Sequence, residues 1–581
     1  MRSTGFLRRL ALVACLGLTV VSASGCADEN DPKTWVDRLP TANKRPSAMR
    51  RLRQMWESKL ASTTPPNNLQ DPQVQQMRNT IVGPVAQAFI EHREEIATRK
   101  EAIEILATVD DARAIPALLA ALEFSPGNSE SERIALRAAQ ALRDLHPQNN
   151  ADVNRRLIAT IDRATGNSGS APAIREAVIQ AIAAVGARDA VPVLQRVLRK
   201  PIDQQEIRTA RAAADALGEL GDTSADSVNA LVYGLFLNVR RANAFNNCSR
   251  ALVKLGPDAA VPALIATIQN QNPDVTVLIN SYAGLPGVQP PPPGYQQATA
   301  IDVLRNFADP RGIEPLLTLL RDHEQTPNVR GASSEALGYT GLALPAADPR
   351  RATIFDALAT VFREGTPGGE DDMAPSVAPA LVLLGDSRAV GVIEQRLQSR
   401  QLQGADTVAY RLGLLMPLAS AVRHDSWSTF DRFATAASAQ LTQLVAQNPD
   451  AQSEIAPVQT QLATIRAVAQ VAHDCNDGDL ACYQSKLSDA EKNVVRKAAY
   501  MIAWTGGENP AARQALLQHA DHVDPLVRRS INIAIDSLSP HGCAECITRL
   551  EGVITAERGQ ESKSLMHLEA QMLIARLRSR R

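Results

Sequence analysis

The chain has 581 residues, a formal net charge of −1 and only 4% aromatic residues. Alanine, leucine and arginine recur along its whole length, and no convincing alternation of β-branched residues predicts a strand. This composition predicts an all-α protein with small residues where helices meet. The near-neutral charge argues against a nucleic-acid-binding protein, because such proteins generally carry a basic excess on one face.

The first 25 residues have the parts of an export signal. Three arginines precede an apolar run over 10–21, which is too short for a membrane-spanning helix. Small residues at 23–25 then lead to Cys26. This arrangement resembles the lipobox of bacterial lipoproteins, although Ala23 stands where leucine is usual. The resemblance implies a signal peptide over 1–25 and lipidation of Cys26; an ordinary cleaved signal peptide is the alternative.

A lipidated Cys26 would become the first residue of the mature chain. That chain keeps 58 basic and 62 acidic side chains, a balance of −4. The next residue is Ala27, not the aspartate that retains many Gram-negative lipoproteins at the inner membrane. We therefore expect an envelope protein, anchored by its lipid at the periplasmic face of the outer membrane. No second apolar segment reaches about 18 residues, so no further membrane span is expected.

A helical hairpin recurs over residues 99–540. One copy, 174–198, has an amphipathic helix that ends at Gly186, a residue suited to a helix C-cap. Asp189 stands before the second helix, as an N-cap residue would, and Pro192 falls in its first turn, where the missing N–H costs little. Equivalent turns lie 35 residues apart, near 186, 221 and 256. This spacing is a repeat period.

Variants of the same turn phrase recur at 109–119, 255–265, 308–317 and 384–393. These residues resemble HEAT repeats, specifically the short HEAT-like type also found in phycobilisome lyases. The resemblance implies an all-α fold, a HEAT-like α-solenoid in which helical hairpins stack into a right-handed superhelix. Because one hairpin cannot bury its own apolar faces, neighbouring hairpins share a continuous core and expose a long concave surface.

The resemblance divides the chain into five segments. We expect a signal peptide over 1–25, a tether with an N-terminal helical cap over 26–98, HEAT-like repeats over 99–400, divergent helical repeats in which the turn phrase fades over 401–490, and C-terminal HEAT-like repeats with a cap over 491–581. The N-terminal cap covers the otherwise exposed end of the first repeat.

Two helices and two loops stand outside the repeat pattern. In the cap we expect one helix over 35–60 and another from residue 72 to about residue 98. The loop 285–295 contains four consecutive prolines, which favour an extended conformation, either as a docking strand for a partner or as a stiff insertion. The loop 365–372 is acidic and is expected to be a solvated hinge.

Four cysteines stand in two close pairs. An exported chain passes through an oxidising compartment, so close pairs favour disulfides. We predict one disulfide between Cys475 and Cys482, closing a short loop between two helices, and one between Cys543 and Cys546, stapling the final repeats. Cys248 lies in an apparent helix and is expected to be a small buried thiol.

Cys543 and Cys546 also allow two kinds of chemistry. A Cys-x-x-Cys pair at a helix N-terminus can exchange disulfides, because the helix dipole favours the thiolate. His541 and the same two thiols could contribute to a zinc site, although no fourth ligand is evident nearby. The surrounding strand–helix pattern of a thioredoxin fold is missing. A calcium loop over 474–479 is disfavoured, because its acidic residues do not stand at EF-hand positions.

The sequence contains no glycine-rich phosphate loop, nucleophile elbow or zinc-protease motif. We therefore expect a non-enzymatic scaffold that binds protein partners through its concave surface, with no cofactor, no metal and no nucleic-acid partner. The alternatives are an envelope thiol–disulfide enzyme that uses Cys543 and Cys546, or a lyase-like HEAT protein. The basic tail, 576–581, could contact anionic lipid or a partner, although helix C-termini favour arginine in any case.

Overall fold

The computed structural model describes residues 28–166, 169–201, 205–239, 242–282, 285, 291–345, 347–399 and 406–580. The predicted signal peptide and Cys26 lie outside the described residues, as do residues 286–290 of the proline-rich loop. The chain forms two compact units, one up to Leu194 and one from Gln195 onward. Strands in the described part are limited to one antiparallel pair, β1 (Asn238–Val239) and β2 (Ala242–Asn243).

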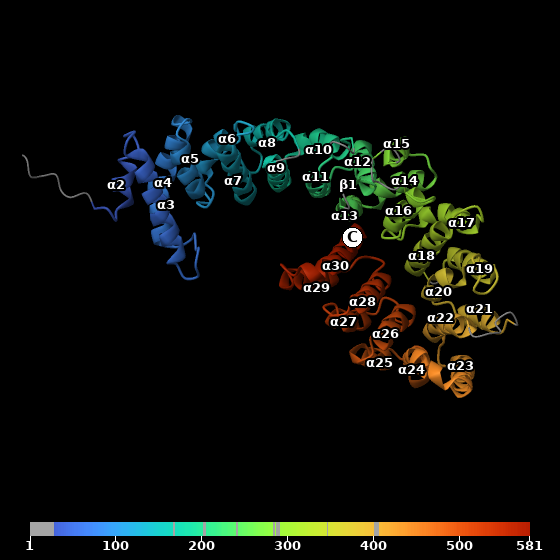
Figure 1. Cartoon of the computed structure of the whole chain (residues 1–581). Helices are drawn as coiled ribbons and strands as arrows, with labels where there is room; N and C mark the ends of the chain where they lie inside the picture. The colour runs from blue at the N-terminus through green and yellow to red at the C-terminus, as the bar shows by residue number, and fades with distance from the viewer. Residues whose placement is uncertain are drawn as a thin grey trace, which may run out of the picture. The chain divides into compact units, whose positions relative to one another are not determined.

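The first unit is built from paired helices in two layers (Figure 1). Its helices are α2 (Pro32–Val36), α3 (Arg45–Ala61), α4 (Pro72–Glu91), α5 (Ile96–Leu106), α6 (Ile115–Ala121), α7 (Ser129–Leu145), α8 (Ala151–Arg163) and α9 (Ala171–Val185). Helices α3, α5, α7 and α9 pack against one another in turn and form what we call the α3–α9 row. Helices α4, α6 and α8 pack against this row from the other side.

The expected cap helices are both interrupted. The helix predicted over 35–60 is two helices, α2 and α3, because residues 37–44 turn around Pro40, which has no N–H to continue a helix. The helix predicted from residue 72 to 98 ends at Glu91, and a turn separates it from α5. Trp56 is fully buried, and its indole N–H donates to Thr108 Oγ1 at 2.9 Å, which fixes α3 against the end of α5.

The second unit has the same two-layer organisation. After α10 (Val191–Leu198), at the boundary of the units, its helices up to the middle are α11 (Ile207–Leu220), α12 (Ala225–Leu235), α13 (Phe245–Leu255), α14 (Pro257–Ile268), α15 (Pro273–Tyr282), α16 (Tyr295–Leu304), α17 (Ile313–Arg321), α18 (Pro327–Ala343), α19 (Pro349–Arg363), α20 (Ala374–Leu383) and α21 (Arg388–Leu397). The remaining helices are α22 (Asp406–Ala421), α23 (Trp427–Gln447), α24 (Gln452–Asp474), α25 (Leu480–Ser485), α26 (Lys492–Thr505), α27 (Pro510–Gln518), α28 (Pro525–Ser537), α29 (Ala544–Ala556) and α30 (Ser564–Ser579). The even-numbered helices from α16 to α30 contact one another in turn and form the α16–α30 row. Between residues 401 and 490, α23 and α24 are unusually long, and here the repeat phrase fades.

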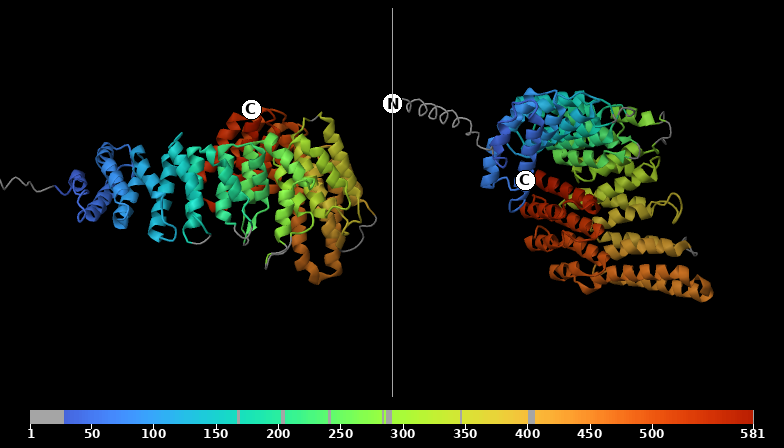
Figure 2. Two further views of the ribbon diagram at one scale, coloured as in Figure 1. Left: turned by 90° about the horizontal axis from the view of Figure 1, so that it is seen from above. Right: turned by 60° about the vertical axis from the view of Figure 1, so that its left-hand side comes forward.

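The second unit doubles back on itself (Figures 1 and 2). We call α13, α16, α18 and α20 its first arm and α26, α28 and α30 its second arm. Helix α30 packs against α13, and α28 contacts α18. Trp504 of α26 donates its indole N–H to the carbonyl of Leu383 at 3.1 Å. The expected continuous concave surface is therefore interrupted in this unit, because its own C-terminal helices cover the first arm.

The recurring turn phrase has a physical explanation. Asp111 accepts hydrogen bonds from the backbone N–H of Arg113 at 2.9 Å and from the guanidinium of the same arginine. This arrangement recurs in the pairs Asp309–Arg311, Asp348–Arg350 and Asp386–Arg388. The hydrogen bonds from the arginine lower the pKa of Asp111. Asp111 and Asp309 thus cap the short turn that leads into the next helix, whereas Asp348 caps α19 directly.

The copy used to define the repeat differs in one respect. Gly186 has a φ of +71° and ends α9 as predicted. Asp189, however, lies inside the 3₁₀ turn Arg188–Ala190 and is not the N-cap residue. The physical reason is register, because Ala187 stands where other copies have the capping aspartate, and Asp189 stands where they have arginine.

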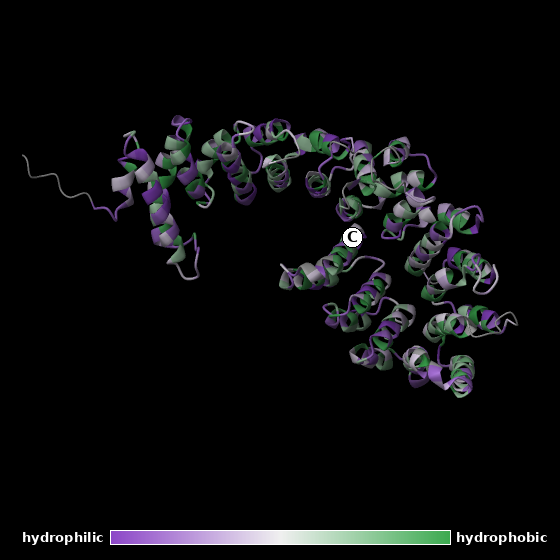
Figure 3. Cartoon of the chain, viewed as in Figure 1, coloured by the Kyte–Doolittle hydropathy of each residue, from purple (hydrophilic) through white to green (hydrophobic). Residues whose placement is uncertain are grey.

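Helix amphipathicity explains the core, and buried arginines fix the ends of its helices. Most helices carry both hydrophobic and hydrophilic residues (Figure 3). Arg330 and Arg528, each near the start of a helix, are buried and donate to backbone carbonyls further back in the chain. The acceptors are Leu320 O, at the end of α17, at 2.9 Å and Asp521 O, in the turn after α27, at 2.8 Å. No described helix combines the length and apolar character needed to cross a bilayer.

The acidic loop 365–372 is more than a solvated hinge. Its last residue, Asp372, accepts a hydrogen bond from Arg396 at 2.9 Å, and both side chains are almost fully buried. Arg396 also donates to the carbonyl of Gly365 at 3.1 Å. The expectation was wrong for Asp372, because a buried guanidinium needs a carboxylate partner and this loop supplies it.

Candidate binding site between the two arms

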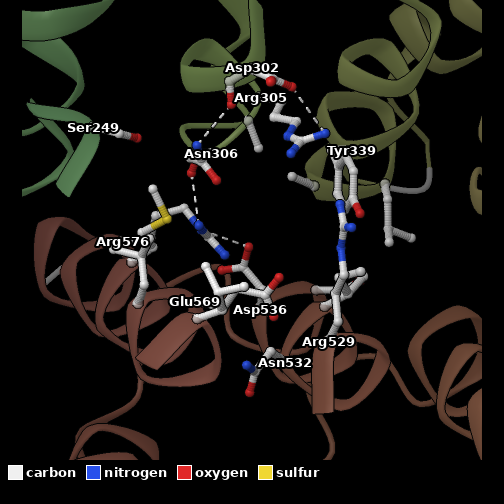
Figure 4. A pocket seen from close by; sticks show the side chains of 18 of the residues that line it. Ser249, Asp302, Arg305, Asn306, Tyr339, Arg529, Asn532, Asp536, Glu569 and Arg576 are labelled. Carbon is white, nitrogen blue, oxygen red and sulfur yellow. Dashed lines mark hydrogen bonds and ion pairs between the residues drawn. The ribbon is translucent and has the colours of Figure 1, made fainter. Parts of the chain in front are cut away.

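Two cavities lie where the arms of the second unit face each other. The smaller, of about 240 Å³, lies between α13, α16 and α18 on one side and α28 and α30 on the other (Figure 4). The larger, of about 680 Å³, is lined by α16, α18, α20 and α22 on one side and by α24, α26 and α28 on the other. Both are lined by residues from each arm, so their shapes depend on how the second unit doubles back.

Arg576 connects the two arms at the smaller cavity (Figure 4). Its Nη1 donates to the carbonyl of Asn306 at 2.9 Å, and its Nε donates to Asp536 Oδ2 at 3.0 Å. Asp302 and Glu569 lie on opposite walls as half-buried carboxylates, and burial raises the pKa of each. Asp302 pairs with Arg305, the C-cap residue of its own helix, at 3.4 Å.

Arg529 makes a second connection between the arms. From α28 its Nη2 lies 3.0 Å from Glu335 Oε1 on α18, and Arg305 Nη1 lies 2.8 Å from the other oxygen of the same carboxylate. The Arg529 guanidinium carbon also lies 5.7 Å from the centre of the Tyr339 ring. Burial raises the pKa of Tyr339 to about 12. One carboxylate on the first arm therefore holds an arginine from each arm.

Two buried polar atoms at the smaller cavity have no hydrogen-bond partner among the described residues. They are Ser249 Oγ and Asn532 Oδ1, in side chains that are 1% and 7% exposed. Figure 4 shows the Ser249 side chain extending from α13 toward the space between the arms. Unpaired buried polar groups are costly, so this end of the contact between the arms is imperfectly matched.

The larger cavity has aromatic walls. The rings of Tyr500 and Trp504 stack with centres 6.2 Å apart and planes 16° apart, and Tyr339 lines the facing arm. Leu526 also lines this cavity and is 46% exposed, which is rare for a large apolar side chain in the described part. An apolar body would find contact surface here.

Lys497 is the most unusual titratable group at the larger cavity. It is 2% exposed, and its Nζ donates to the carbonyls of Ala419 at 2.6 Å and Val422 at 2.9 Å, at the C-terminal end of α22. Burial lowers its pKa to about 7. A neutral amine has two N–H groups, which matches the two carbonyls, so Lys497 ties α26 to α22.

The two predicted disulfides are present. Cys475–Cys482 joins the end of α24 to the first turn of α25, as predicted. Cys543–Cys546 differs from the expectation, because both residues belong to the start of α29, where Cys543 is the N-cap and its Sγ accepts a hydrogen bond from the Cys546 N–H at 3.1 Å. Residues three apart at a helix start are neighbours, so this bond does not staple two repeats.

The surroundings of Cys543 and Cys546 weigh against both chemical alternatives. Exchange requires a thiolate to reach a sulfur, yet Cys543 is 7% exposed and Cys546 is fully buried. Glu545 offers an oxygen within 4.8 Å of both sulfurs, but these sulfurs are bonded to each other. His541, the third expected zinc ligand, lies 3.6 Å from the Glu508 carboxylate.

The remaining sequence candidates have structural roles in the described part. Cys248 is a buried free thiol, as predicted, and burial raises its pKa. In the calcium-like segment, Asp474 pairs with Lys486 at 2.8 Å and Asp479 caps α25. In the basic tail, the described arginines form ion pairs with acidic residues of the same unit, namely Arg576 and Arg580 with Asp536, and Arg578 with Glu551.

Comparison with known proteins supports the repeat assignment. The family model described as PBS lyase HEAT-like repeat matches residues 98–124, which cover most of α5, a turn and α6. A comparison with curated proteins finds no match.

Two solved structures are weakly similar to this chain. Importin beta is 13% identical, with a TM-score of 0.39, and the match covers 92% of this chain and 78% of that chain. Human deoxyhypusine hydroxylase is 15% identical, with a TM-score of 0.21, and the match covers 54% of this chain and 99% of that chain. Such low TM-scores carry no argument about function. The stacked two-layer helical pairs make the fold an α-solenoid, and its hairpin at residues 98–124 is similar to the HEAT-like repeat of that family model.

Proposed function

We propose that the chain is a lipid-anchored, non-enzymatic scaffold of the cell envelope that binds protein partners through the α3–α9 row. The signal-like start and Cys26 support export and lipidation. The burial of Cys543 and Cys546 supports a structural role for that disulfide. The observation that carries the proposal is the exposed charged surface of the α3–α9 row.

Ion pairs connect successive helices of this row. Their side chains are partly exposed, and within the described part of the first unit no further helical layer covers them. The pairs, with their shortest N–O distances, are Arg53–Glu101 at 2.6 Å between α3 and α5, and Arg137–Glu104 at 3.1 Å and Lys100–Glu130 at 2.9 Å between α5 and α7. An amide extends the row, because Arg143 Nη1 donates to Gln180 Oε1 at 3.1 Å between α7 and α9.

Such pairs contribute little to folding. Exposed ion pairs are worth about 0–1 kcal/mol each, so the ion pairs of the row are not needed for stability. Its charges alternate in sign, which suits the polar surface of a protein partner and not the uniform negative charge of a nucleic acid. The row therefore supports a protein-binding function.

The partner-binding claim can be tested in envelope extracts. We expect the full chain to recover a reproducible set of proteins, and Arg137→Glu to lose most of that set, because it places two carboxylates together on the row. Arg155→Glu is the matched control, since Arg155 lies on α8, outside the row, and its side chain is 77% exposed. Equal recovery by both variants, or no reproducible partner for the wild-type chain, would contradict the proposal.

The anchor is tested separately. The wild-type chain should incorporate a clickable palmitate analogue and fractionate with outer membranes, whereas Cys26→Ser should remain unlabelled and leave the membrane fraction. Labelling that persists in Cys26→Ser would show that the lipid is attached elsewhere. Absence of label in the wild type would refute the anchor and leave the partner-binding claim standing.

A further inference from the structure

The larger cavity between the arms has the dimensions of a small-ligand site. Its volume of about 680 Å³ lies within the 300–1,000 Å³ that ligand pockets usually occupy. Tyr339 from one arm and the stacked Tyr500 and Trp504 from the other supply aromatic walls. Leu526 adds an exposed apolar surface to the same wall. These features fit an apolar, preferably aromatic, body.

The two arginines at this cavity differ in whether a carboxylate pairs with them. Arg496 and Arg529 lie on the neighbouring helices α26 and α28, each two residues after a buried valine, and both line the cavity. Arg529 meets the carboxylate of Glu335. Arg496 donates only to neutral oxygens, Ser530 Oγ at 3.3 Å and Asn493 Oδ1 at 3.1 Å. Among the described residues, no carboxylate lies within ion-pair distance of Arg496.

The two acidic residues that line the larger cavity are already engaged. Glu335 holds Arg305 and Arg529, and Asp302 lies 3.4 Å from Arg305. Lys497, the neighbour of Arg496, is bonded to two carbonyls and adds no negative charge. The cavity therefore retains one half-buried guanidinium without a counter-charge. A guanidinium in this setting favours a carboxylate, which it can hold through two parallel hydrogen bonds.

We propose that this cavity binds a carboxylate attached to an apolar, aromatic body, with the carboxylate on Arg496 and the body between Tyr339, Tyr500 and Trp504. The ligand is either a free aromatic carboxylic acid or the C-terminal carboxylate of a peptide that ends in an aromatic residue. The two sources share the same chemistry at Arg496. This inference does not rest on the proposed scaffold function, because it concerns a different unit of the chain.

Calorimetric titration of the full chain tests the proposal. The probes are 3-phenylpropionate, its neutral amide, and the peptide Ala-Ala-Ala-Phe with either a free or an amidated C-terminus. We expect at least one of the two acids to bind, and at least ten times more tightly than its amide. Tighter binding of the peptide acid would identify a protein terminus as the source, and tighter binding of phenylpropionate would identify a small molecule. No binding of either acid, or equal binding of the amides, would overturn the proposal.

Variants connect the binding to Arg496. Arg496→Met should weaken binding of the acid at least ten-fold and leave binding of the amide unchanged, and Arg496→Lys should show an intermediate loss. Arg549→Met is the control, because Arg549 pairs with Asp521 outside the cavity. Circular dichroism checks that each variant is folded, and Arg496→Lys, which keeps the charge, provides the readout if the methionine variant does not fold. Affinity for the acid within two-fold of wild type in the folded Arg496 variants would overturn the assignment.

Discussion

The two units use the same repeat differently. In the first, the ion pairs of the α3–α9 row, such as Arg137–Glu104, connect neighbouring helices and remain partly exposed. In the second, Glu335 of the α16–α30 row forms the equivalent contact with Arg305 on the neighbouring helix. The same carboxylate also receives Arg529 from a helix 194 residues further along the chain. One row is thus left uncovered within its unit, and the other already holds a helix.

This difference indicates what such a row can bind. A helix that presents an arginine to a carboxylate between two repeats is held in place, as α28 is held against α18. The second unit thus contains, within one chain, an example of the kind of contact that we propose the first unit makes with a partner. The comparison of the two units also distinguishes ion pairs that hold two arms of the fold together from ion pairs that leave a surface available to a partner.

The largest expected effect concerns a buried ion pair of the second arm. Arg528 holds Glu557 through two hydrogen bonds, of 2.5 and 2.9 Å, and their side chains are 4% and 14% exposed. Arg528→Met removes the guanidinium from this carboxylate and from two backbone carbonyls, and leaves Lys563 at 3.5 Å and His567 at 3.1 Å beside Glu557. It should lower the free energy of unfolding by about 3–5 kcal/mol. Urea titration followed by circular dichroism measures this. The exposed control Arg155→Met should change the free energy of unfolding by no more than about 0.5 kcal/mol. Similar losses in Arg528→Met and Arg155→Met would mean that the buried pair stabilises the fold no more than an exposed side chain does.

The next effect concerns the contact at the end of α20. Gly385 has a φ of +68°, and a Cβ added there would lie 2.6 Å from the Trp504 ring of the second arm. Gly385→Ala should therefore destabilise the second unit by about 2–4 kcal/mol, through backbone strain and overpacking. Gly221→Ala is the control, because Gly221 has a φ of +66° but open space around it. It should cost about 1–2 kcal/mol from backbone strain alone, and an equal loss in both variants would show that the arms do not meet at Trp504.

Lys497 gives the contact between α26 and α22 a pH dependence. Its pKa is about 7 in the folded chain against 10.5 for the free side chain. Between these values the unfolded chain binds more protons, so the stability of the wild type rises with pH relative to Lys497→Met. The difference in unfolding free energy should shift by up to about 1.4 kcal/mol for each pH unit between 7 and 9. A difference that is independent of pH would mean that Lys497 is not buried.

The smallest effects concern the exposed contacts of the two rows. A double-mutant cycle on Arg529 and Glu335 should give a coupling of about 1 kcal/mol, because the pair joins two arms across a cavity. The cycle on Arg137 and Glu104 should give about 0.3 kcal/mol, as for ordinary surface pairs. Both couplings should disappear in 1 M salt, where the screening length is about 3 Å. A larger coupling for Arg137 and Glu104 than for Arg529 and Glu335 would contradict the proposed difference between the two units.

The sequence predicts the local features of this chain well. The turn at Gly186, the disulfide Cys475–Cys482 and the buried thiol of Cys248 all follow from periodicity or spacing, and the structure confirms them. The error at Asp189 is one of register, because the repeat keeps its turn while the capping aspartate is replaced by Ala187. Local sequence patterns therefore predict local structure. An exception such as Asp189 can be recognised only when that copy of the repeat is aligned with the other copies.

The contact between the arms could not be predicted in this way. Helical periodicity shows that Glu335 and Arg529 face away from the core of their hairpins, and not that they face each other. From the sequence, a lysine such as Lys497 is expected to be exposed. It is buried because the end of α22 supplies two carbonyls that accept its hydrogen bonds. Arg496 likewise carries no distinguishing signal, since arginine recurs throughout the chain.

Site-specific photo-cross-linking in intact cells tests the central claim most directly. A photoreactive amino acid placed at Glu104 on the α3–α9 row should cross-link to other proteins. The same group at Glu335, where Arg305 and Arg529 of this chain already meet, or at Asp152 on α8, outside the row, should yield fewer such products. Cross-links from Glu335 or Asp152 with none from Glu104 would contradict the account.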